Sequence, residues 1–231
     1  MTTVAIMQPT YLPWLGYFAL MDRVDIFVFL DSVQFERRSW QQRNRIKGPH
    51  GEQTLTVPVF TKGLREQRIN EVRIDPSAGF PEKHVRAIQH AYASAPHFES
   101  HGPGLAEILR RHHNHLADLT IELIQWLAGK LGIITQSMRS SSLKATGRKA
   151  DLLADICRML GAEQYVSPPG ARPYLEDSDA FDRLEIPIIY NDFCHPAYPQ
   201  GHGVFQSHLS VVDLLFNVGV DSRAVINEGL S

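Results

Sequence analysis

Short apolar runs alternate with segments of helical periodicity along most of the chain. Residues 3–7 and 25–30 are compact apolar runs typical of buried strands, and residues 15–24 have the composition of a short helix. This order predicts a βαβ unit, whose parallel strands end at one edge of their sheet, where open α/β sheets bind ligands. At that edge we expect the residues that follow the two strands, namely Gln8, Pro9 and Asp31.

The middle of the chain combines a predicted hairpin with helices. Two strand-like runs flank a Gly/Pro turn and predict a β-hairpin over residues 41–59, and a further strand is expected at residues 68–74. Apolar residues at three- and four-residue steps predict helices at residues 81–93 and 104–131. The second of these runs also fits two helices, because Asn114 lies near its middle.

The last third of the chain returns to an α/β alternation. Strands are predicted at residues 133–138, 164–167 and 186–190, and helices at residues 149–160 and 210–217, the last with Ser210 as N-cap and Gly219 as its end. The expected fold is α/β, with a mostly parallel open sheet flanked by helices, an inserted β-hairpin and a helical segment. Residues 1–231 are expected to form a single α/β domain, in which residues 78–132 are a candidate helical subdomain.

Charge and composition narrow the class of protein. The formal net charge is -2, whereas proteins that bind nucleic acids in general carry a strongly basic face, so we expect no nucleic-acid partner. No apolar stretch approaches the ~20 residues that span a bilayer, and the first residues lack the basic start of a signal peptide. Cys157 and Cys194 are too few for a disulfide framework. We therefore expect a cytoplasmic protein with no membrane span.

A dense proline and aromatic cluster covers residues 8–18. Its prolines restrict the backbone, Gly16 permits a close approach, and Tyr11 and Trp14 supply stacking surfaces with polar tips. Such a loop before a helix suits a nucleotide, a sugar or a phosphate. Gln8, Pro9, Tyr11, Trp14 and Gly16 are candidate substrate-binding residues. The alternative is that these aromatic side chains pack the start of the core.

A basic cluster follows the second predicted strand. Four arginines lie within residues 37–45, and this concentration of like charge favours a site for a phosphate or carboxylate. Strand alternation over residues 41–47 places Arg43 and Arg45 on one face. The candidate substrate-binding residues of this segment are Gln34, Arg38, Trp40, Arg43 and Asn44. The alternative is a solvated edge strand whose charges resist aggregation.

A loop rich in proline, glycine and histidine covers residues 192–205. His195 is a candidate general base and Tyr198 a candidate donor to a developing oxyanion, while Gln200 is a candidate substrate-binding residue. A Cys194/His195 nucleophile pair would need an unusual geometry, because neighbours in an extended segment point to opposite faces. The alternative is that His195 only bonds the backbone of its own loop.

Two further segments are weaker candidates for a binding site. His112 and His115 lie three residues apart in a predicted helix, but no acidic or cysteine partner nearby completes a metal site, so no metal site is predicted. Lys149 precedes a predicted helix and is a candidate phosphate contact, although the segment lacks the glycine spacing of a P-loop. The sequence identifies no cofactor.

Several of these blocks resemble the WbqC-like protein family. They are QPTYLPWLGYF, LDSVQFERRSWQQRNRI, LTVPV, GRKADLLADICRMLGAEQYVS, HPAYPQ and LSVVDLLFN, and they span nearly the whole chain. The resemblance implies a bacterial protein of surface-polysaccharide or other secondary-metabolite biosynthesis. The first block is also similar to the opening of HIGH-motif nucleotidylyltransferases, but the histidines that flank the glycine in those enzymes are absent around Gly16.

The leading hypothesis is a transferase that acts on an activated small molecule, such as a nucleotide-linked amino sugar or an acyl-activated precursor. In this hypothesis Gln8, Tyr11 and Trp14 shape the pocket, Arg38 and Arg43 bind an anionic group, and His195 with Asp31 supplies acid/base function. One alternative is a nucleotidylyltransferase or an adenylate-forming ligase. Another is a non-catalytic binding or scaffold protein of a biosynthetic complex.

Overall fold

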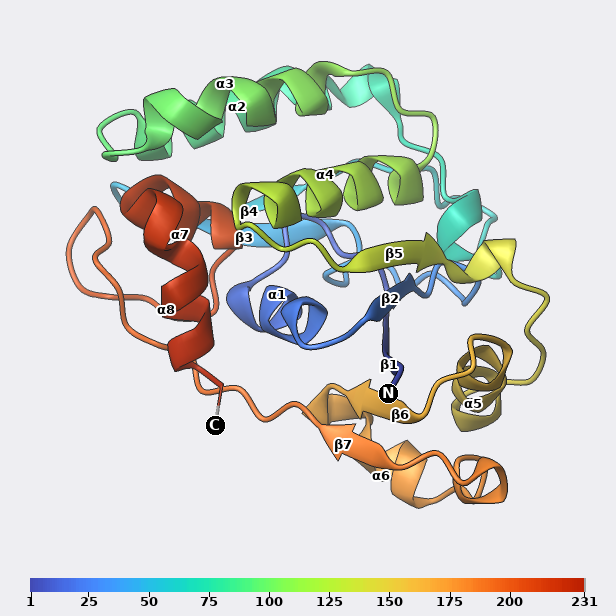
Figure 1. The fold of residues 1–231 in the computed structure, drawn as a ribbon. Helices are drawn as coiled ribbons and strands as arrows, with labels where there is room; N and C mark the ends of the chain where they lie inside the picture. The colour runs from blue at the N-terminus through green and yellow to red at the C-terminus, as the bar shows by residue number, and fades with distance from the viewer. Residues whose placement is uncertain (231) are drawn as a thin grey trace.

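A parallel β-sheet forms the centre of the computed structural model, which describes residues 1–230 (Figure 1). Within those residues, five strands lie in the order β5-β2-β1-β6-β7, and every neighbouring pair is parallel. The strands are β1 (Thr3–Met7), β2 (Ile26–Phe29), β5 (Gln136–Arg139), β6 (Gln164–Ser167) and β7 (Ile188–Tyr190). The prediction of an open parallel sheet is confirmed.

Both faces of this sheet are buried, because alternate residues of its central strands enter two different apolar clusters. Ala5 and Phe27 belong to the first cluster, whereas Val4 and Val28 belong to the second. Helices that pack on the first cluster are α1 (Leu15–Asp22), α4 (Leu116–Lys130), α7 (Val211–Val218) and α8 (Ser222–Glu228). Those that pack on the second are α5 (Ala150–Met159) and α6 (Arg172–Glu176).

The predicted hairpin and helical segment lie outside the sheet on the first face. Strands β3 (Arg43–Gly48) and β4 (Gly51–Thr56) pair antiparallel, which confirms the hairpin. Helices α2 (Phe80–Tyr92) and α3 (Phe98–Arg110) pack together as an outer layer above α4 (Figure 1). The apolar run at residues 104–131 is therefore two helices, as its central asparagine suggested.

Two sequence predictions differ from the structure, and two helices were missed. The strand expected at residues 68–74 is wrong: Ile69–Glu71 is a single 3-10 turn, closed by the Arg68 amide donating to the Glu71 carboxylate at 2.7 Å. This segment pairs only through isolated bridges, so its alternating pattern never joins a sheet. His112 does not lie on a helix, because the chain between α3 and α4 is irregular. Helices α6 and α8 were not predicted, since each is too short to show a period.

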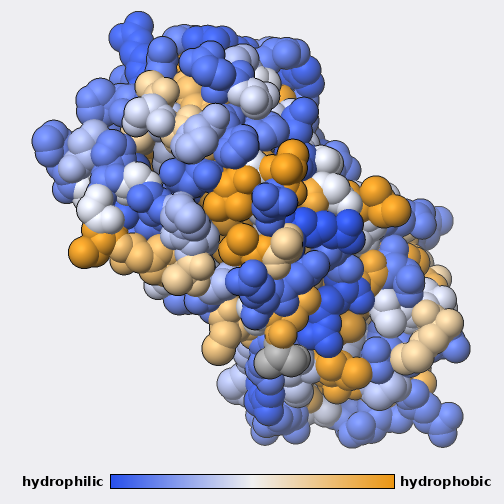
Figure 2. All heavy atoms as spheres, turned by 60° about the vertical axis from the view of Figure 1, so that its left-hand side comes forward, coloured by the Kyte–Doolittle hydropathy of each residue, from blue (hydrophilic) through white to orange (hydrophobic). Residues whose placement is uncertain are grey.

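Hydrophobic and hydrophilic side chains are mixed on the face that carries α7 and α8. Figure 2 turns this side forward and shows apolar patches in the middle of the face among hydrophilic residues. Among the helices of residues 1–230, none is long and apolar enough to cross a membrane.

Candidate active site

The strand order reverses at β1, because β2 lies on one side of it and β6 on the other. In open α/β sheets such a reversal leaves a crevice beyond the carboxyl ends of the strands. A cavity of about 350 Å³ lies at this position, and we call it the switch-point chamber. Its lining includes Met7 at the end of β1 and the residues directly after β2 and β6, Leu30 and Pro168. The polar side chains of Gln8, Glu36 and Gln41 also line it.

A second cavity of about 360 Å³ has Met7, Thr10 and Trp40 in common with the first, so the two are neighbours, and we call the pair the cleft. We call this second cavity the aromatic chamber. The aromatic and polar side chains that line it are Trp14, Tyr17, Trp40, Asn44, Arg45 and His208. The cleft therefore has two parts. The aromatic chamber contains one cation, Arg45, and the switch-point chamber contains side-chain amides and a carboxylate.

The opening loop, residues 8–14, is held in a strained conformation beside this cleft. Leu12 has a φ of 45°, in the left-handed region that non-glycine residues rarely adopt. The Asn44 side-chain amide donates to the Tyr11 carbonyl at 3.1 Å and to the Leu12 carbonyl at 2.7 Å. Asn44 was a candidate substrate-binding residue, but both of its amide protons hold the loop.

Tyr11 points into the core rather than toward a ligand. Its hydroxyl lies 2.7 Å from Nδ1 of His84, and both side chains are buried. Burial lowers the pKa of His84 to about 4, so this imidazole is neutral at physiological pH. Pro9 is also buried. For Tyr11, the geometry matches the packing interpretation of the aromatic cluster.

Trp14 lies across Gly16 and reaches the histidine loop, residues 192–209. A Cβ atom at Gly16 would approach the Trp14 ring to 2.4 Å, so only glycine leaves room for the indole in this position. The indole stacks on His208 with ring centroids 5.2 Å apart, and on His195 with centroids 6.2 Å apart. Two segments from opposite ends of the sequence therefore meet at one aromatic stack.

His195 is a neutral imidazole with a defined tautomer. Its Nδ1 lies 2.9 Å from the Pro196 carbonyl, and a carbonyl can only accept, so Nδ1 carries the proton. Burial lowers the pKa of His195 below its ordinary value, which keeps the ring neutral. The lone pair then lies on Nε2, which is buried and has no hydrogen-bond partner among residues 1–230. His195 does bond the backbone of its own loop, as the alternative interpretation expected. This bond leaves the lone pair on Nε2 available to act as a base.

Tyr198 and Gln200 hold the histidine loop against a buried carboxylate. The Tyr198 hydroxyl donates to Asp213 at 2.9 Å, and the Gln200 amide donates to the same oxygen at 2.8 Å. Tyr92 donates to the other oxygen of Asp213 at 2.8 Å. Burial raises the pKa of Asp213 despite these donors. The protons of Tyr198 and Gln200 are thus engaged within the protein.

Lys47 joins the same network, which we call the polar hub. Its ammonium group is almost fully buried, and it donates to the Gln200 side-chain oxygen at 3.1 Å and to the Val204 carbonyl at 2.6 Å. The hub therefore ties β3, α2 and α7 to the loop that carries His195. Neither Lys47 nor Asp213 was singled out from the sequence, because their partners come from distant segments.

Among the arginines, Arg45 is the one that lines the aromatic chamber. Its guanidinium packs over the Trp40 ring at 5.4 Å and pairs with Glu52 at 2.8 Å. The burial pattern of β3 confirms that Arg43 and Arg45 share one face. Arg38, which has a φ of 58°, and Arg43 lie outside the linings of the two chambers.

Asp31 connects the ends of β2 and β5. It is fully buried and accepts hydrogen bonds from the Ser140 hydroxyl at 3.0 Å and from the Ser141 amide at 2.8 Å. It lies at the carboxyl edge of the sheet, as expected, but both of its oxygens are taken up by this serine turn. In the described part of the chain, no contact joins Asp31 to His195.

The remaining candidates lie at different places along the carboxyl edge. Gln8 lines the switch-point chamber and accepts a hydrogen bond from the Gln41 amide at 2.8 Å. Gln34 donates to the Arg65 carbonyl at 3.1 Å, away from both chambers. Lys149 is the exposed N-cap residue of α5.

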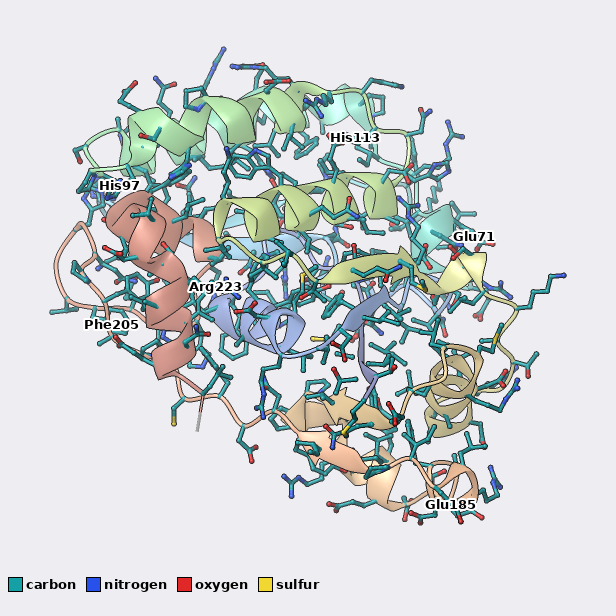
Figure 3. All side chains as sticks on the ribbon, in the orientation of Figure 1. Glu71, His97, His113, Glu185, Phe205 and Arg223 are labelled. Atoms are coloured by element: carbon teal, nitrogen blue, oxygen red, sulfur yellow. The ribbon has the colours of Figure 1, made fainter. Side chains whose placement is uncertain are left out.

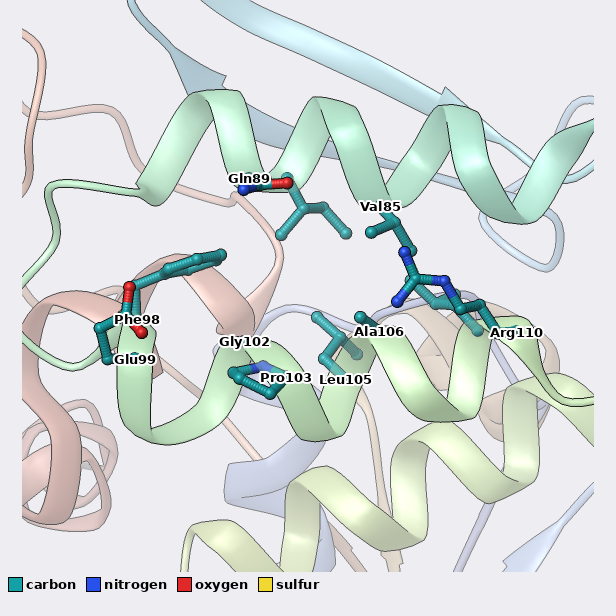
Figure 4. A pocket seen from close by; sticks show the side chains of 11 residues that line it. Val85, Gln89, Phe98, Glu99, Gly102, Pro103, Leu105, Ala106 and Arg110 are labelled. Atoms are coloured by element: carbon teal, nitrogen blue, oxygen red, sulfur yellow. The ribbon is translucent and has the colours of Figure 1, made fainter.

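A separate cavity of about 300 Å³ lies between α2 and α3 (Figure 4). Val85 and Leu105 face each other across it, and Arg110 at one end pairs with Glu82. None of the predicted site residues lines it. Over residues 1–230, no group of three or more His, Cys, Asp or Glu side chains could hold a metal ion.

Fold and cleft together define an open parallel α/β protein whose candidate site lies where the strand order reverses. The model of the WbqC-like protein family matches residues 8–225, and the chain belongs to this family. A protein of Mycobacterium tuberculosis, named uncharacterized protein Rv1507c, is 39% identical over 224 residues, which are 96% of this chain and 96% of that protein. The comparison with solved structures found no significant match.

Proposed function

We propose that this protein is a transferase that acts on an activated small molecule bound in the two-chamber cleft. The observation that carries the proposal is the state of His195: a neutral ring, a proton fixed on Nδ1, and a buried lone pair on Nε2 beside the aromatic chamber. A neutral imidazole is a base of suitable strength near pH 7.

In the proposed reaction, Nε2 of His195 takes the proton from a hydroxyl or amino group of the acceptor. The acceptor oxygen or nitrogen then forms a bond to the activated atom of the donor, and the leaving group departs with the electron pair of the broken bond. The hydrogen bond from Nδ1 to the Pro196 carbonyl would stabilise the resulting imidazolium. Asp31 and Tyr198, whose polar atoms are engaged within the protein, act here as positioning residues.

The lining of the cleft favours a nucleotide-linked amino sugar or a similar precursor. Amides and carboxylates, such as those of Gln8, Gln41 and Glu36, suit the hydroxyl and amino groups of a sugar. The rings of Trp14 and Trp40 suit an aromatic group. A role in bacterial surface-polysaccharide or secondary-metabolite biosynthesis is consistent with such a substrate.

A thermal-shift panel followed by a turnover assay tests the proposal. Nucleotide sugars, nucleotides, acyl donors and amino acids would be screened, since a ligand at 100 times its dissociation constant adds ~2.7 kcal/mol to stability. With the best donor, His195→Ala is expected to abolish product formation detected by mass spectrometry. His90→Ala, at an exposed histidine of α2 that lines neither chamber, is the matched control and should retain activity.

The alternatives predict different results. A nucleotidylyltransferase or ligase would release pyrophosphate from ATP in the presence of magnesium. A scaffold protein would be stabilised by none of these ligands. Activity of the His195→Ala variant within twofold of the parent protein would remove His195 from the reaction.

A further inference from the structure

His208 occupies a stacking position that a planar ligand could take. Its imidazole lies 5.2 Å from the Trp14 ring, with 23° between the planes, and it lines the aromatic chamber. Stacking of this kind on tryptophan is how many proteins hold nucleobases. The chamber therefore already contains a planar ring, supplied by the protein itself.

This ring also closes over His195. The two imidazoles lie 5.0 Å apart, while Trp14, Tyr198 and Phe205 surround the remainder of the His195 ring at 6.2, 6.1 and 5.8 Å. Nε2 of His195 is buried beneath this arrangement, with no partner in the described part of the chain. A base in this position can reach a substrate only after one of the covering rings moves.

Of the covering rings, Trp14 and His208 line the aromatic chamber, and His208 is the less firmly held of the two. Its side chain is exposed, and its φ of 60° lies in the left-handed region, which costs free energy for a histidine. Its carbonyl accepts a hydrogen bond from Arg45 at 3.3 Å, and its ring bonds the adjacent Ser207 at 2.8 Å. Trp14 and Tyr198, in contrast, are fixed by Gly16 and the polar hub.

The loop before His208 is exposed but anchored, so the movement that we infer is one of the His208 side chain. Residues 201–205 are exposed and include two glycines, and Phe205 lies out on this loop (Figure 3). The loop is anchored by Lys47, which bonds the Val204 carbonyl, by His202, which bonds the Ala91 carbonyl, and by Gln200, which bonds Asp213 and Gln206. A displacement of His208 therefore need not disturb the anchor that positions His195.

Resting on the proposed function, we propose that a planar aromatic ring of the substrate, of the nucleobase type, replaces the His208 imidazole on Trp14, so that Nε2 of His195 is exposed to the bound substrate and no longer to His208. Trp40, whose side chain is 50% exposed, forms a second stacking surface in the same chamber. Arg45, which packs over this ring and pairs with Glu52, is the cation of the chamber that we assign to the phosphate of such a ligand. Binding of the ring and exposure of the base are then one event.

Calorimetric titration tests the ring exchange without turnover. AMP and UMP are compared with ribose 5-phosphate, which has the sugar and phosphate but no ring. The parent protein should bind at least one nucleotide more than tenfold more tightly than ribose 5-phosphate. His208→Ala should bind that nucleotide threefold to tenfold more tightly than the parent, because the competing ring is gone, and Trp40→Ala should bind it at least fivefold more weakly.

Chemical modification tests the exposure of the base. Diethyl pyrocarbonate modifies accessible neutral imidazoles, and site-resolved mass spectrometry reports each histidine separately. His195 should react at least fivefold faster in His208→Ala than in the parent protein, and the bound nucleotide should slow the reaction in that variant. His90, an exposed residue of α2 that lines neither chamber, serves as an internal reference whose rate should not change.

The inference is overturned if ribose 5-phosphate binds as tightly as the nucleotides, or if His208→Ala changes neither nucleotide affinity nor the reactivity of His195. These readouts are independent of catalysis. If the nucleotide replaces His208 but His195→Ala keeps full turnover, only the proposed function is contradicted. If His195→Ala loses turnover but no ring exchange is observed, only this inference is contradicted.

Discussion

The indole of Trp14 and the imidazole of His195 lie nearly parallel, with 15° between their planes and 6.2 Å between their centroids. Trp14 precedes the first helix, and His195 lies in the loop before α7. Their contact brings the proline-aromatic opening and the late histidine loop to one cleft. The proposed function depends on this meeting of two distant segments.

Gly16→Ala should displace Trp14, because the added Cβ atom would lie 2.4 Å from its ring. We expect a loss of about 1–3 kcal/mol of unfolding free energy, measured by urea denaturation, and an altered tryptophan fluorescence spectrum. Gly129→Ala is the matched control in α4, where nothing lies within 4 Å of the added atom. This control should be neutral or slightly stabilising. Equal stability of the two variants would contradict the proposed packing of Trp14.

Asn44→Ala should loosen the opening loop, because it leaves the Tyr11 and Leu12 carbonyls without their donor. The expected loss is about 1–3 kcal/mol in the same denaturation assay. Gln53→Ala, at an exposed position of β4, should change stability by less than about 0.5 kcal/mol. An Asn44→Ala variant as stable as this control would show that the strained loop does not need its amide anchor.

The sheet could be predicted from the sequence because its strands can be recognised from the residues of each strand alone. The apolar runs of β1 and β2 need no partner to be recognised, and the position of Gln8 at the carboxyl edge follows from the βαβ rule. The segment at Ile69–Glu71 has a similar local pattern but no neighbouring strand to pair with. Its failure as a strand depends on tertiary pairing, which a local pattern does not contain.

The site could be predicted only in part, for the same reason. Trp14, from the proline and aromatic cluster, and Trp40, from the basic cluster, were candidate binding residues, and both line the aromatic chamber. Alternation along β3 puts Arg43 and Arg45 on one face, so it could not distinguish the arginine that reaches the chamber from the one that does not. The serine partners of Asp31 are more than a hundred residues away, and nothing near it in the sequence indicates them.

Asp213→Asn should disrupt the polar hub. The buried carboxylate accepts hydrogen bonds from Tyr92, Tyr198 and Gln200. The amide group of asparagine has an NH2 group in place of one carboxylate oxygen, so at least one of these donors would face another donor. We expect a loss of about 2–4 kcal/mol in unfolding free energy. Asp221→Asn, at an exposed site before α8, is the control and should change stability by less than about 0.5 kcal/mol. A hub variant as stable as the control would mean that Asp213 does not anchor the histidine loop.

His84 should make the protein less stable in mild acid. Burial lowers its pKa to about 4 in the folded protein, whereas an unfolded histidine titrates near ~6.5. Above pH ~6.5 the ring is neutral in both states. As the pH falls from ~6.5 toward 4, the unfolded chain binds a proton that the folded protein does not, which costs ~3 kcal/mol in total and then levels off.

The measurement is urea denaturation at a series of pH values between 7 and 4. The parent protein should lose ~3 kcal/mol more over this range than His84→Gln, in which the glutamine can still bond the Tyr11 hydroxyl. Parallel stability curves for the two proteins would show that His84 is not buried in a neutral state.

The state of His195 can be measured directly by long-range ¹H–¹⁵N correlation spectroscopy of the imidazole nitrogens, with the signal assigned by its loss in His195→Gln. At pH 7 the structure predicts a neutral ring with the proton on Nδ1 and a bare Nε2, and a titration midpoint below the ordinary value of 6.5. A proton on Nε2, or a doubly protonated ring at pH 7, would contradict the assignment of His195 as the base.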